Sequence, residues 1–79
     1  MSSDLILLEK MEKNGSWFSL HYEEIVKKHK NEFVAIEDAK IIAHNPRLDA
    51  LLKELRKKRK NLNDILIEFV AEKETKFIL

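Results

Sequence analysis

The sequence predicts one small α+β domain with the element order α-α-β-β-α-β and a short further strand at its end. Three observations predict this class. Apolar residues recur at helical spacing in three segments, they run consecutively in three short segments rich in β-branched residues, and no repeat or linker divides the 79 residues. We therefore expect a single domain over residues 1–79, with an N-terminal helix at 2–13, a core at 16–71 and the extra strand at 76–79.

The first helix is predicted over residues 2–13, where Leu5, Leu8 and Met11 recur at helical spacing. Asn14-Gly15 follows directly. Glycine adopts the left-handed conformation of a helix C-cap at little cost. Asn-Gly also closes hairpins, but the flanking residues have a helical period rather than an alternating one. The sequence therefore predicts that this helix ends at Asn14-Gly15.

A second helix is predicted to begin at Ser16 or Ser19 and to run to Lys30. Apolar side chains form one face of this segment, and glutamates and lysines form the other. The residues of the apolar face are Phe18, Tyr22, Ile25, Val26 and His29.

A β-hairpin is predicted next. Residues 33–36 read Phe-Val-Ala-Ile, residues 40–44 read Lys-Ile-Ile-Ala-His, and Asp38-Ala39 forms a two-residue turn between them. Each arm is apolar at adjacent positions, so both faces of the hairpin need cover. The hairpin is therefore not expected to stand free on the surface.

A third helix is predicted after Asn45-Pro46, because asparagine is a good N-cap and proline suits the first helical position. Its apolar stripe consists of Leu48, Leu51, Leu52 and Leu55, and the helix is predicted to run out through Arg59, Lys60 and Asn61. Residues 65–70 are predicted as the third strand, with Ile65, Ile67 and Phe69 on one face. Residues 76–79 are predicted to pair back as a short fourth strand.

The order of these motifs resembles that of a known family. Residues 22–28 read Tyr-Glu-Glu-Ile-Val-Lys-Lys, residues 31–36 read Asn-Glu-Phe-Val-Ala-Ile, and the Lys-Ile-Ile-Ala-His arm follows. With the Leu-rich helix and the strand at 65–70, residues 17–70 resemble small archaeal and bacterial proteins of unknown function. That family usually has glycine where this chain has Ala39 and Asn45, so the departures concern turn geometry. The resemblance implies the fold and the hairpin, and it implies no activity or site residue.

The composition excludes several classes of protein. The chain is 44% hydrophobic and 37% charged, and it has no cysteine, one glycine and one proline. A disulfide scaffold, a cysteine-based zinc site, a glycine-rich phosphate loop and a collagen-like chain are therefore excluded. The apolar runs are too short to span a bilayer and the first residues do not form a secretory signal, so we expect a cytoplasmic protein. The Lys- and Glu-rich composition without glutamine is also typical of heat-adapted proteins.

The histidines and acids predict no reactive site. His21 and Glu24 are three residues apart on one predicted helix, with His29 two turns beyond His21, and no second His-rich segment completes a ligand set. His44 ends the second strand, where hydrogen bonding to the turn is favoured over metal binding or proton transfer. The carboxylates lie among lysines or beside turns, as solvated residues do. We therefore predict no catalytic residue, metal ligand or cofactor, and no enzymatic activity.

The positive charge of the chain is concentrated in one segment. Residues 40–60 carry a net charge of +6, whereas residues 1–39 carry −3 and residues 61–79 carry −2. Arg56, Lys57, Arg59 and Lys60, at the end of the third helix, are candidate contacts to nucleic-acid phosphates. The alternative is that they complement the helix C-terminus and stay solvated. Since no aromatic residues interleave with them, as in single-strand binders, the solvated role is favoured.

The apolar segments need more burial than 79 residues supply easily. A domain of this length buries only about 60% of the surface of its unfolded chain, and no disulfide compensates. The apolar tail Phe77, Ile78 and Leu79 adds to this demand, so we expect self-association through the tail or a sheet edge. The predicted function is a protein–protein interaction module, a homodimer or a binder of another protein, with no membrane partner. The alternative is a small nucleic-acid-binding protein that uses the basic helix end.

Overall fold

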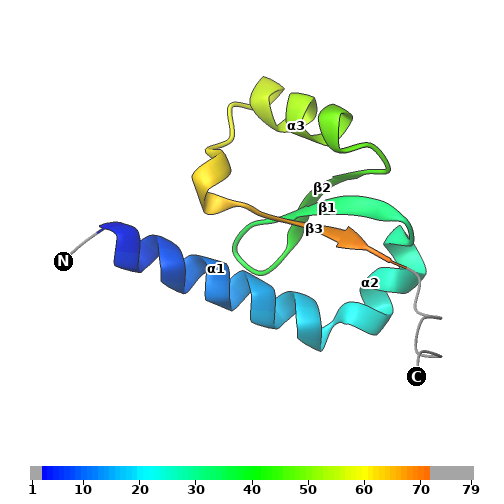
Figure 1. Cartoon of the computed structure of the whole chain (residues 1–79), viewed down its shortest axis with the longest axis horizontal. Coiled ribbons are helices and arrows are strands. Elements are labelled where there is room, and N and C mark those ends of the chain that lie inside the picture. Colours follow the sequence, from blue (N-terminus) through cyan, green and yellow to red (C-terminus); the bar gives the residue numbers. More distant parts are fainter. Residues whose placement is uncertain (1–2, 72–79) are drawn as a thin grey trace.

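A three-stranded antiparallel sheet with helices on both faces forms the fold in the computed structural model, which describes residues 3–71 and the side chains of residues 8–71 (Figure 1). The elements are α1 (Ser3–Leu20), α2 (Tyr22–His29), β1 (Glu32–Ile36), β2 (Ile41–Asn45), α3 (Leu48–Lys57), a 3₁₀ turn (Leu62–Asp64) and β3 (Leu66–Val70). The predicted α+β class and the order α-α-β-β-α-β are confirmed. The fourth strand proposed at 76–79 lies outside the described residues.

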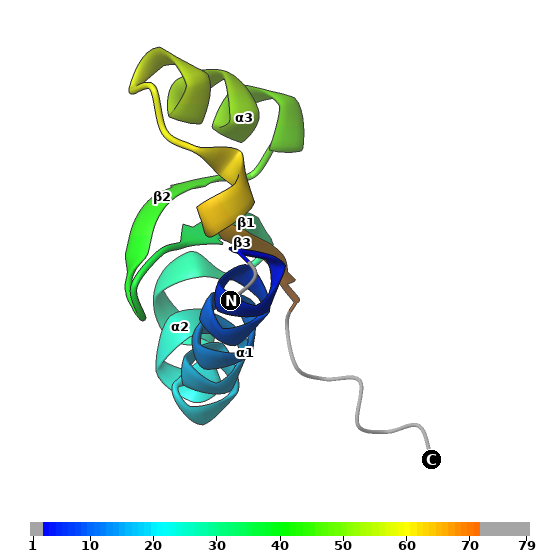
Figure 2. The ribbon, with the colours of Figure 1, turned by 90° about the vertical axis from the view of Figure 1, so that its left-hand side faces the viewer.

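The strands lie in the order β2-β1-β3, so the central strand is β1. Successive β1 side chains point to opposite faces of the sheet. Ala35 packs under α3 in a cluster with Leu51 and Leu55, whereas Val34 and Ile36 pack in a second cluster on the side of α1 and α2. Figure 2 shows α3 on one side of the sheet and the other two helices on the opposite side. The expectation that both faces need cover is therefore confirmed.

The turn between β1 and β2 is the predicted two-residue turn. Asp38 and Ala39 both have positive φ, 53° and 58°, which is the conformation of a type I′ turn. The backbone N–H of Glu37 donates to the carbonyl of Lys40 at 2.9 Å, and the N–H of Lys40 donates back at 3.2 Å. Ala39 therefore occupies a left-handed position at which alanine is strained.

The first helix differs from the prediction, because α1 continues through Asn14-Gly15 to Leu20. Asn14 is 2% exposed and contacts the hairpin turn. Its side-chain oxygen accepts a hydrogen bond from the Ala39 N–H at 2.9 Å, and its amide donates to the Ile36 carbonyl at 3.5 Å. Gly15 does not adopt positive φ. A tertiary contact of Asn14 thus replaces the local C-cap that the sequence suggested.

The bounds of α3 also differ from the prediction. Asn45 belongs to β2 and its side chain accepts from the Arg47 N–H at 2.9 Å, while Arg47 takes the N-cap position. At the other end, the N–H of Lys60 donates to the Leu55 carbonyl at 3.0 Å and Arg59 has a φ of 58°. This is a Schellman motif with a non-glycine residue at C′. The helix therefore ends at Lys57, and residues 58–60 follow it.

No helix in the described part of the chain is long and apolar enough to cross a membrane.

We expect Asn14→Ala to destabilise the protein by about 1 kcal/mol. The substitution removes a buried hydrogen-bond partner of the turn, which costs roughly 1–3 kcal/mol, while alanine returns part of this through its higher helix propensity. Urea unfolding followed by circular dichroism measures the change. Ser19→Ala, on the exposed side of the same helix, is the control. Equal stability of Asn14→Ala and the wild type would contradict the docking role of Asn14.

Ala39→Gly is expected to stabilise the protein by about 0.5–1 kcal/mol. Glycine removes the left-handed strain of alanine, roughly 1–2 kcal/mol, and loses part of the gain to its greater freedom in the unfolded chain. Ala50→Gly makes the same change inside α3 and is expected to destabilise by about 1 kcal/mol. Thermal unfolding of both variants measures the contrast, and a loss of stability in Ala39→Gly would show that the turn is not strained.

Candidate functional site

Three polar side chains meet where α2 leads into β1. His29 is the last residue of α2, Glu32 is the first residue of β1, and His44 lies near the end of β2. Their ligand-type atoms all lie within 4.8 Å of one another. We call this group the His-Glu-His cluster. It lies at the right-hand end of the sheet in Figure 1, on the face covered by α1 and α2.

The geometry of the cluster centres on one carboxylate oxygen. Glu32 Oε1 lies 3.2 Å from His29 Nδ1 and 3.0 Å from His44 Nδ1. An ionised carboxylate only accepts hydrogen bonds, so each imidazole donates to it from Nδ1. The two imidazole rings lie 4.5 Å apart between centroids, tilted by 56°. Side-chain exposure rises from 16% at His29 and 22% at Glu32 to 50% at His44, so the cluster opens to solvent on the His44 side.

The backbone explains why these residues meet. α2 ends at His29, and Asn31 adopts a φ of 61°, a conformation that asparagine tolerates, while its N–H donates to the Val70 carbonyl at 2.6 Å. This turn brings Glu32 back beneath the helix end. In the sheet, His44 pairs with Val34, which is two residues from Glu32 on the same face of β1. Glu32 and His44 are therefore diagonal neighbours across two strands.

The sequence predicts no ligand role for any of these residues, because their meeting depends on strand register. Along the chain, His29 is grouped with His21 and Glu24 on one predicted helix. In the structure His21 and Glu24 form an exposed pair of their own, with 3.7 Å between Nδ1 and Oε1. One sequence pattern indicates the cluster: His29 and Glu32 are three residues apart across a helix end, and His44 is on the neighbouring strand of the hairpin.

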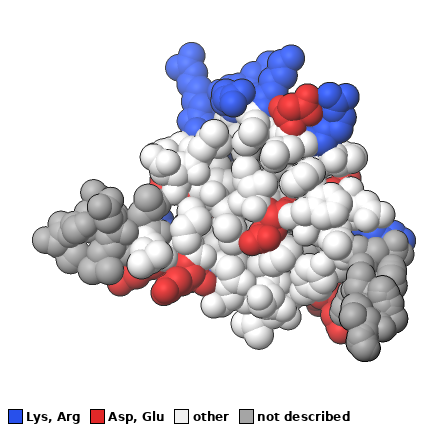
Figure 3. Space-filling view, in the orientation of Figure 1, with Lys and Arg blue, Asp and Glu red and all other residues white. Residues whose placement is uncertain are grey.

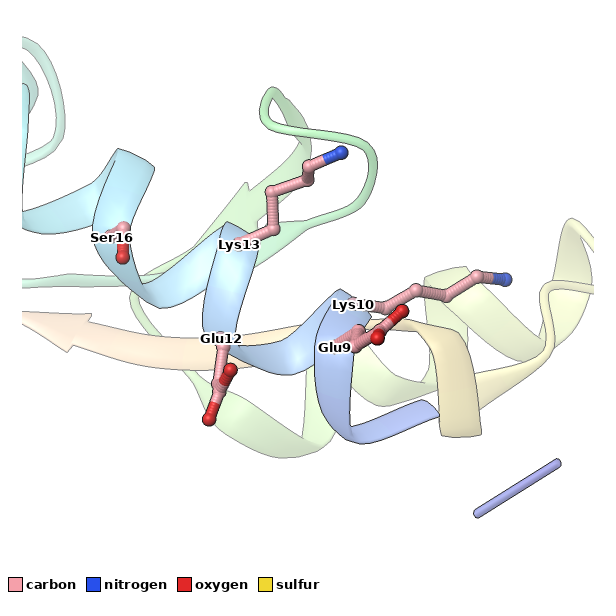
Figure 4. A pocket seen from close by; sticks show the side chains of 5 residues that line it. All are labelled: Glu9, Lys10, Glu12, Lys13 and Ser16. Atoms are coloured by element: carbon pink, nitrogen blue, oxygen red, sulfur yellow. The ribbon is translucent and has the colours of Figure 1, made fainter. Parts of the chain in front are cut away.

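Two hollows of the described surface lack the size or the converging polar groups of a typical ligand pocket. One has a volume of about 240 Å³, lies beside Trp17, His21 and His29, and is smaller than most ligand pockets, which measure roughly 300–1,000 Å³. The other lies along α1 and is lined by charged residues of both signs. Its Glu12 and Lys13 point in opposite directions (Figure 4), so its polar groups do not converge on a ligand.

A basic surface covers the exposed side of α3 and the residues that follow it. Figure 3 shows Lys and Arg gathered along the top of the molecule, where α3 lies. Lys53, Arg56, Lys57 and Arg59 are all exposed, and within the described part of the chain none of them forms an ion pair. We call these four residues the basic surface. Since Lys53, Arg56 and Lys57 are three and four residues apart, they lie on one side of the helix.

Three other cations between residues 47 and 60 have a carboxylate partner. Lys60, a predicted nucleic-acid contact, forms an ion pair with Glu37 at 2.9 Å. Lys58 pairs with Glu54 at 3.2 Å. Arg47 binds Asp49 through two hydrogen bonds of 2.8 and 3.2 Å, which raise the pKa of the arginine and lower the pKa of the carboxyl group. Of the four predicted contacts, Arg56, Lys57 and Arg59 are therefore available to a ligand, and Lys60 instead ties the end of α3 to the hairpin.

The predicted self-association residues Phe77, Ile78 and Leu79 lie outside the described residues. A large apolar side chain of the third strand lies on the surface. Phe69 of β3 is 44% exposed and stacks against Phe33 of β1, with 4.8 Å between ring centroids.

Comparison with known proteins identifies a family. The model of the Family of unknown function (DUF5678) matches residues 24–73, well over half of the chain. These residues include the sheet, α3, the His-Glu-His cluster and the basic surface. No curated protein and no solved structure matches the chain significantly.

Proposed function

The chain belongs to a family of unknown function (DUF5678). We propose that it is a non-enzymatic interaction module that self-associates through the outer edge of β3. The main support for this proposal is that β3 combines an unpaired sheet edge with an exposed aromatic residue. We propose that the module acts in the cytoplasm. That compartment is reducing and does not favour disulfides, and this chain has no cysteine to form one.

The open edge follows from the strand order. Because β1 lies between β2 and β3, each outer strand has one edge, and within residues 3–71 no other strand pairs with the edge of β3. Such an edge offers a row of free N–H and C=O groups to a second chain. Pairing of two copies through β3 extends the sheet to six strands.

The exposed ring of Phe69 supports β3 over β2 as the interaction edge. On its face of the sheet, α3 packs mainly against β2 and also against β1. The cover is therefore thinnest over β3, and there Phe69 lies beside the half-buried Phe33. An aromatic pair on an open edge is an apolar anchor of the kind that contributes most to protein interfaces.

The charges on β3 favour one register. Antiparallel pairing of two copies centred on Glu68 sets two carboxylates directly opposite each other, which is destabilising. Pairing centred on Phe69 instead sets the two rings opposite each other and places Glu68 against Val70 of the second copy. We therefore propose a two-fold interface centred on Phe69.

Phe69→Lys is expected to shift the protein from dimer to monomer. Loss of an aromatic anchor and the approach of two like charges should weaken association by about 30-fold or more, the effect of losing about 2 kcal/mol at an interface. Sedimentation equilibrium over a range of concentrations measures the mass against the 9.4 kDa of one chain. Leu20→Lys, which changes an 80%-exposed leucine at the end of α1, is the matched control and should leave the mass unchanged.

A wild-type protein that stays monomeric at all concentrations would overturn the proposal, as would loss of the dimer in Leu20→Lys but not in Phe69→Lys. Deletion of residues 76–79 separates the two proposed contributions. A monomeric deletion variant with Phe69 intact would assign the interface to the C-terminal residues instead of the β3 edge.

Nucleic-acid binding is the second candidate, and the unpaired charges of the basic surface favour it. Neighbouring cations that lack carboxylate partners keep their full charge for phosphate groups. The opposing observation is the position of the aromatic pair, because Phe33 and Phe69 lie on the sheet and not among these cations. Binding would therefore rest on phosphate contacts without base stacking.

Triple replacement of Arg56, Lys57 and Arg59 by alanine is expected to abolish such binding at near-physiological salt. It should also lower the slope of log affinity against log salt by about three, one for each lost phosphate contact. Fluorescence anisotropy with labelled single- and double-stranded DNA and RNA measures both effects. The control replaces the exposed lysines Lys13, Lys27 and Lys28, which removes the same charge elsewhere. Equal loss in both variants would show a net-charge effect, and no binding at low salt would remove this candidate.

A further inference from the structure

The His-Glu-His cluster brings three donor atoms of the kinds that bind transition metals within 4.8 Å of one another. Zinc binds histidine nitrogen and carboxylate oxygen at about 2.0–2.2 Å in tetrahedral sites, so neighbouring ligand atoms around it lie about 3.3–3.6 Å apart, a few tenths of an ångström more than the hydrogen-bond distances in the cluster. Glu32 Oε1 lies 3.2 Å and 3.0 Å from the two Nδ1 atoms. We propose that His29, Glu32 and His44 bind a divalent transition-metal ion, of which zinc is the best fit, with one ligand atom from each residue.

The chemistry of the donors selects the class of ion. Two imidazoles and one carboxylate form a set that suits zinc and its neighbours in the first transition row. Calcium and magnesium prefer shells made of oxygen alone, so two of these three donors suit them poorly. In the metal-free chain, the protons on the two Nδ1 atoms hold the imidazoles against the carboxylate. Metal binding through Nδ1 requires each neutral imidazole to take its other tautomer, in which the proton is on Nε2 and Nδ1 offers its lone pair to the ion.

The three ligands are held by parts of the fold that are fixed independently of a metal. The turn at Asn31 sets His29 against Glu32, and the β1–β2 register sets His44 beside them. Little conformational freedom therefore remains to be lost on binding. The 50% exposure of the His44 side chain provides a route of entry and leaves room for water as a fourth ligand. A bound ion would join the end of α2 to both arms of the hairpin.

Titration of the untagged full chain with zinc chloride, followed by calorimetry, tests the proposal. We expect saturable binding of one zinc per chain. His44→Ala changes a half-exposed side chain and Glu32→Gln keeps the side-chain size, so both variants should fold, which circular dichroism without zinc verifies. Each should lower zinc affinity by at least about tenfold, the lower end of what the loss of even an outer-shell partner costs.

His21→Ala is the matched control, because His21 is a histidine of the same helix region that pairs with Glu24 outside the cluster. It should bind zinc as the wild type does. Long-range ¹H–¹⁵N spectra provide a readout at the atoms themselves, since the Nδ1 signals of His29 and His44 should move on zinc addition while those of His21 stay in place. Absence of saturable binding, or equal loss of affinity in His21→Ala, would overturn the proposal.

Discussion

Burial of the central strand on both faces is the constraint on which the rest of the structure depends. Val34, Ala35 and Ile36 of β1 are fully buried, and because neighbouring strand residues point to opposite faces, no single layer of helices could cover them. α3 therefore covers one face, and α1 with α2 covers the other. Each large side chain buried in this way, such as Leu51 or Leu55, contributes about 1.5–3 kcal/mol relative to an exposed one, which matters in a domain this small.

The polar features of the molecule are arranged around that apolar strand. Glu32, at the start of β1, carries the His-Glu-His cluster, and Glu37, just past its end, holds Lys60. Glu32 and Glu37 are five positions apart, so their Cα atoms lie roughly 16 Å apart along an extended strand. The cluster lies on the face covered by α1 and α2, whereas the Glu37–Lys60 pair joins the residues after α3 to the hairpin. The free edge of β3 is the outer edge of the sheet opposite β2. A metal ion, a second copy of the chain and a nucleic acid would therefore occupy separate surfaces.

Within residues 3–71, backbone strain is concentrated in the connections between elements. Asn31, Asp38, Ala39 and Arg59 all have positive φ, at the α2–β1 turn, the hairpin turn and the end of α3. None of them is glycine, so each position depends on neighbouring contacts to hold it. Asn14 binds the N–H of Ala39, the Val70 carbonyl binds the N–H of Asn31, and the Schellman hydrogen bonds fix Arg59. These contacts hold the turns that bring the polar groups together.

The sequence by itself determined the elements and their order, because the helical and strand periods and the two-residue turn are local properties of the chain. It also located the basic segment, since charge can be counted without a fold. Tertiary structure alone decided that α1 continues past Asn14, because that side chain contacts a turn 25 residues away. It likewise decided that Lys60 is neutralised, that Phe69 is exposed and that His44 meets His29 and Glu32. Each of these outcomes depends on strand register and on where a helix lies over the sheet, which no short window of sequence contains.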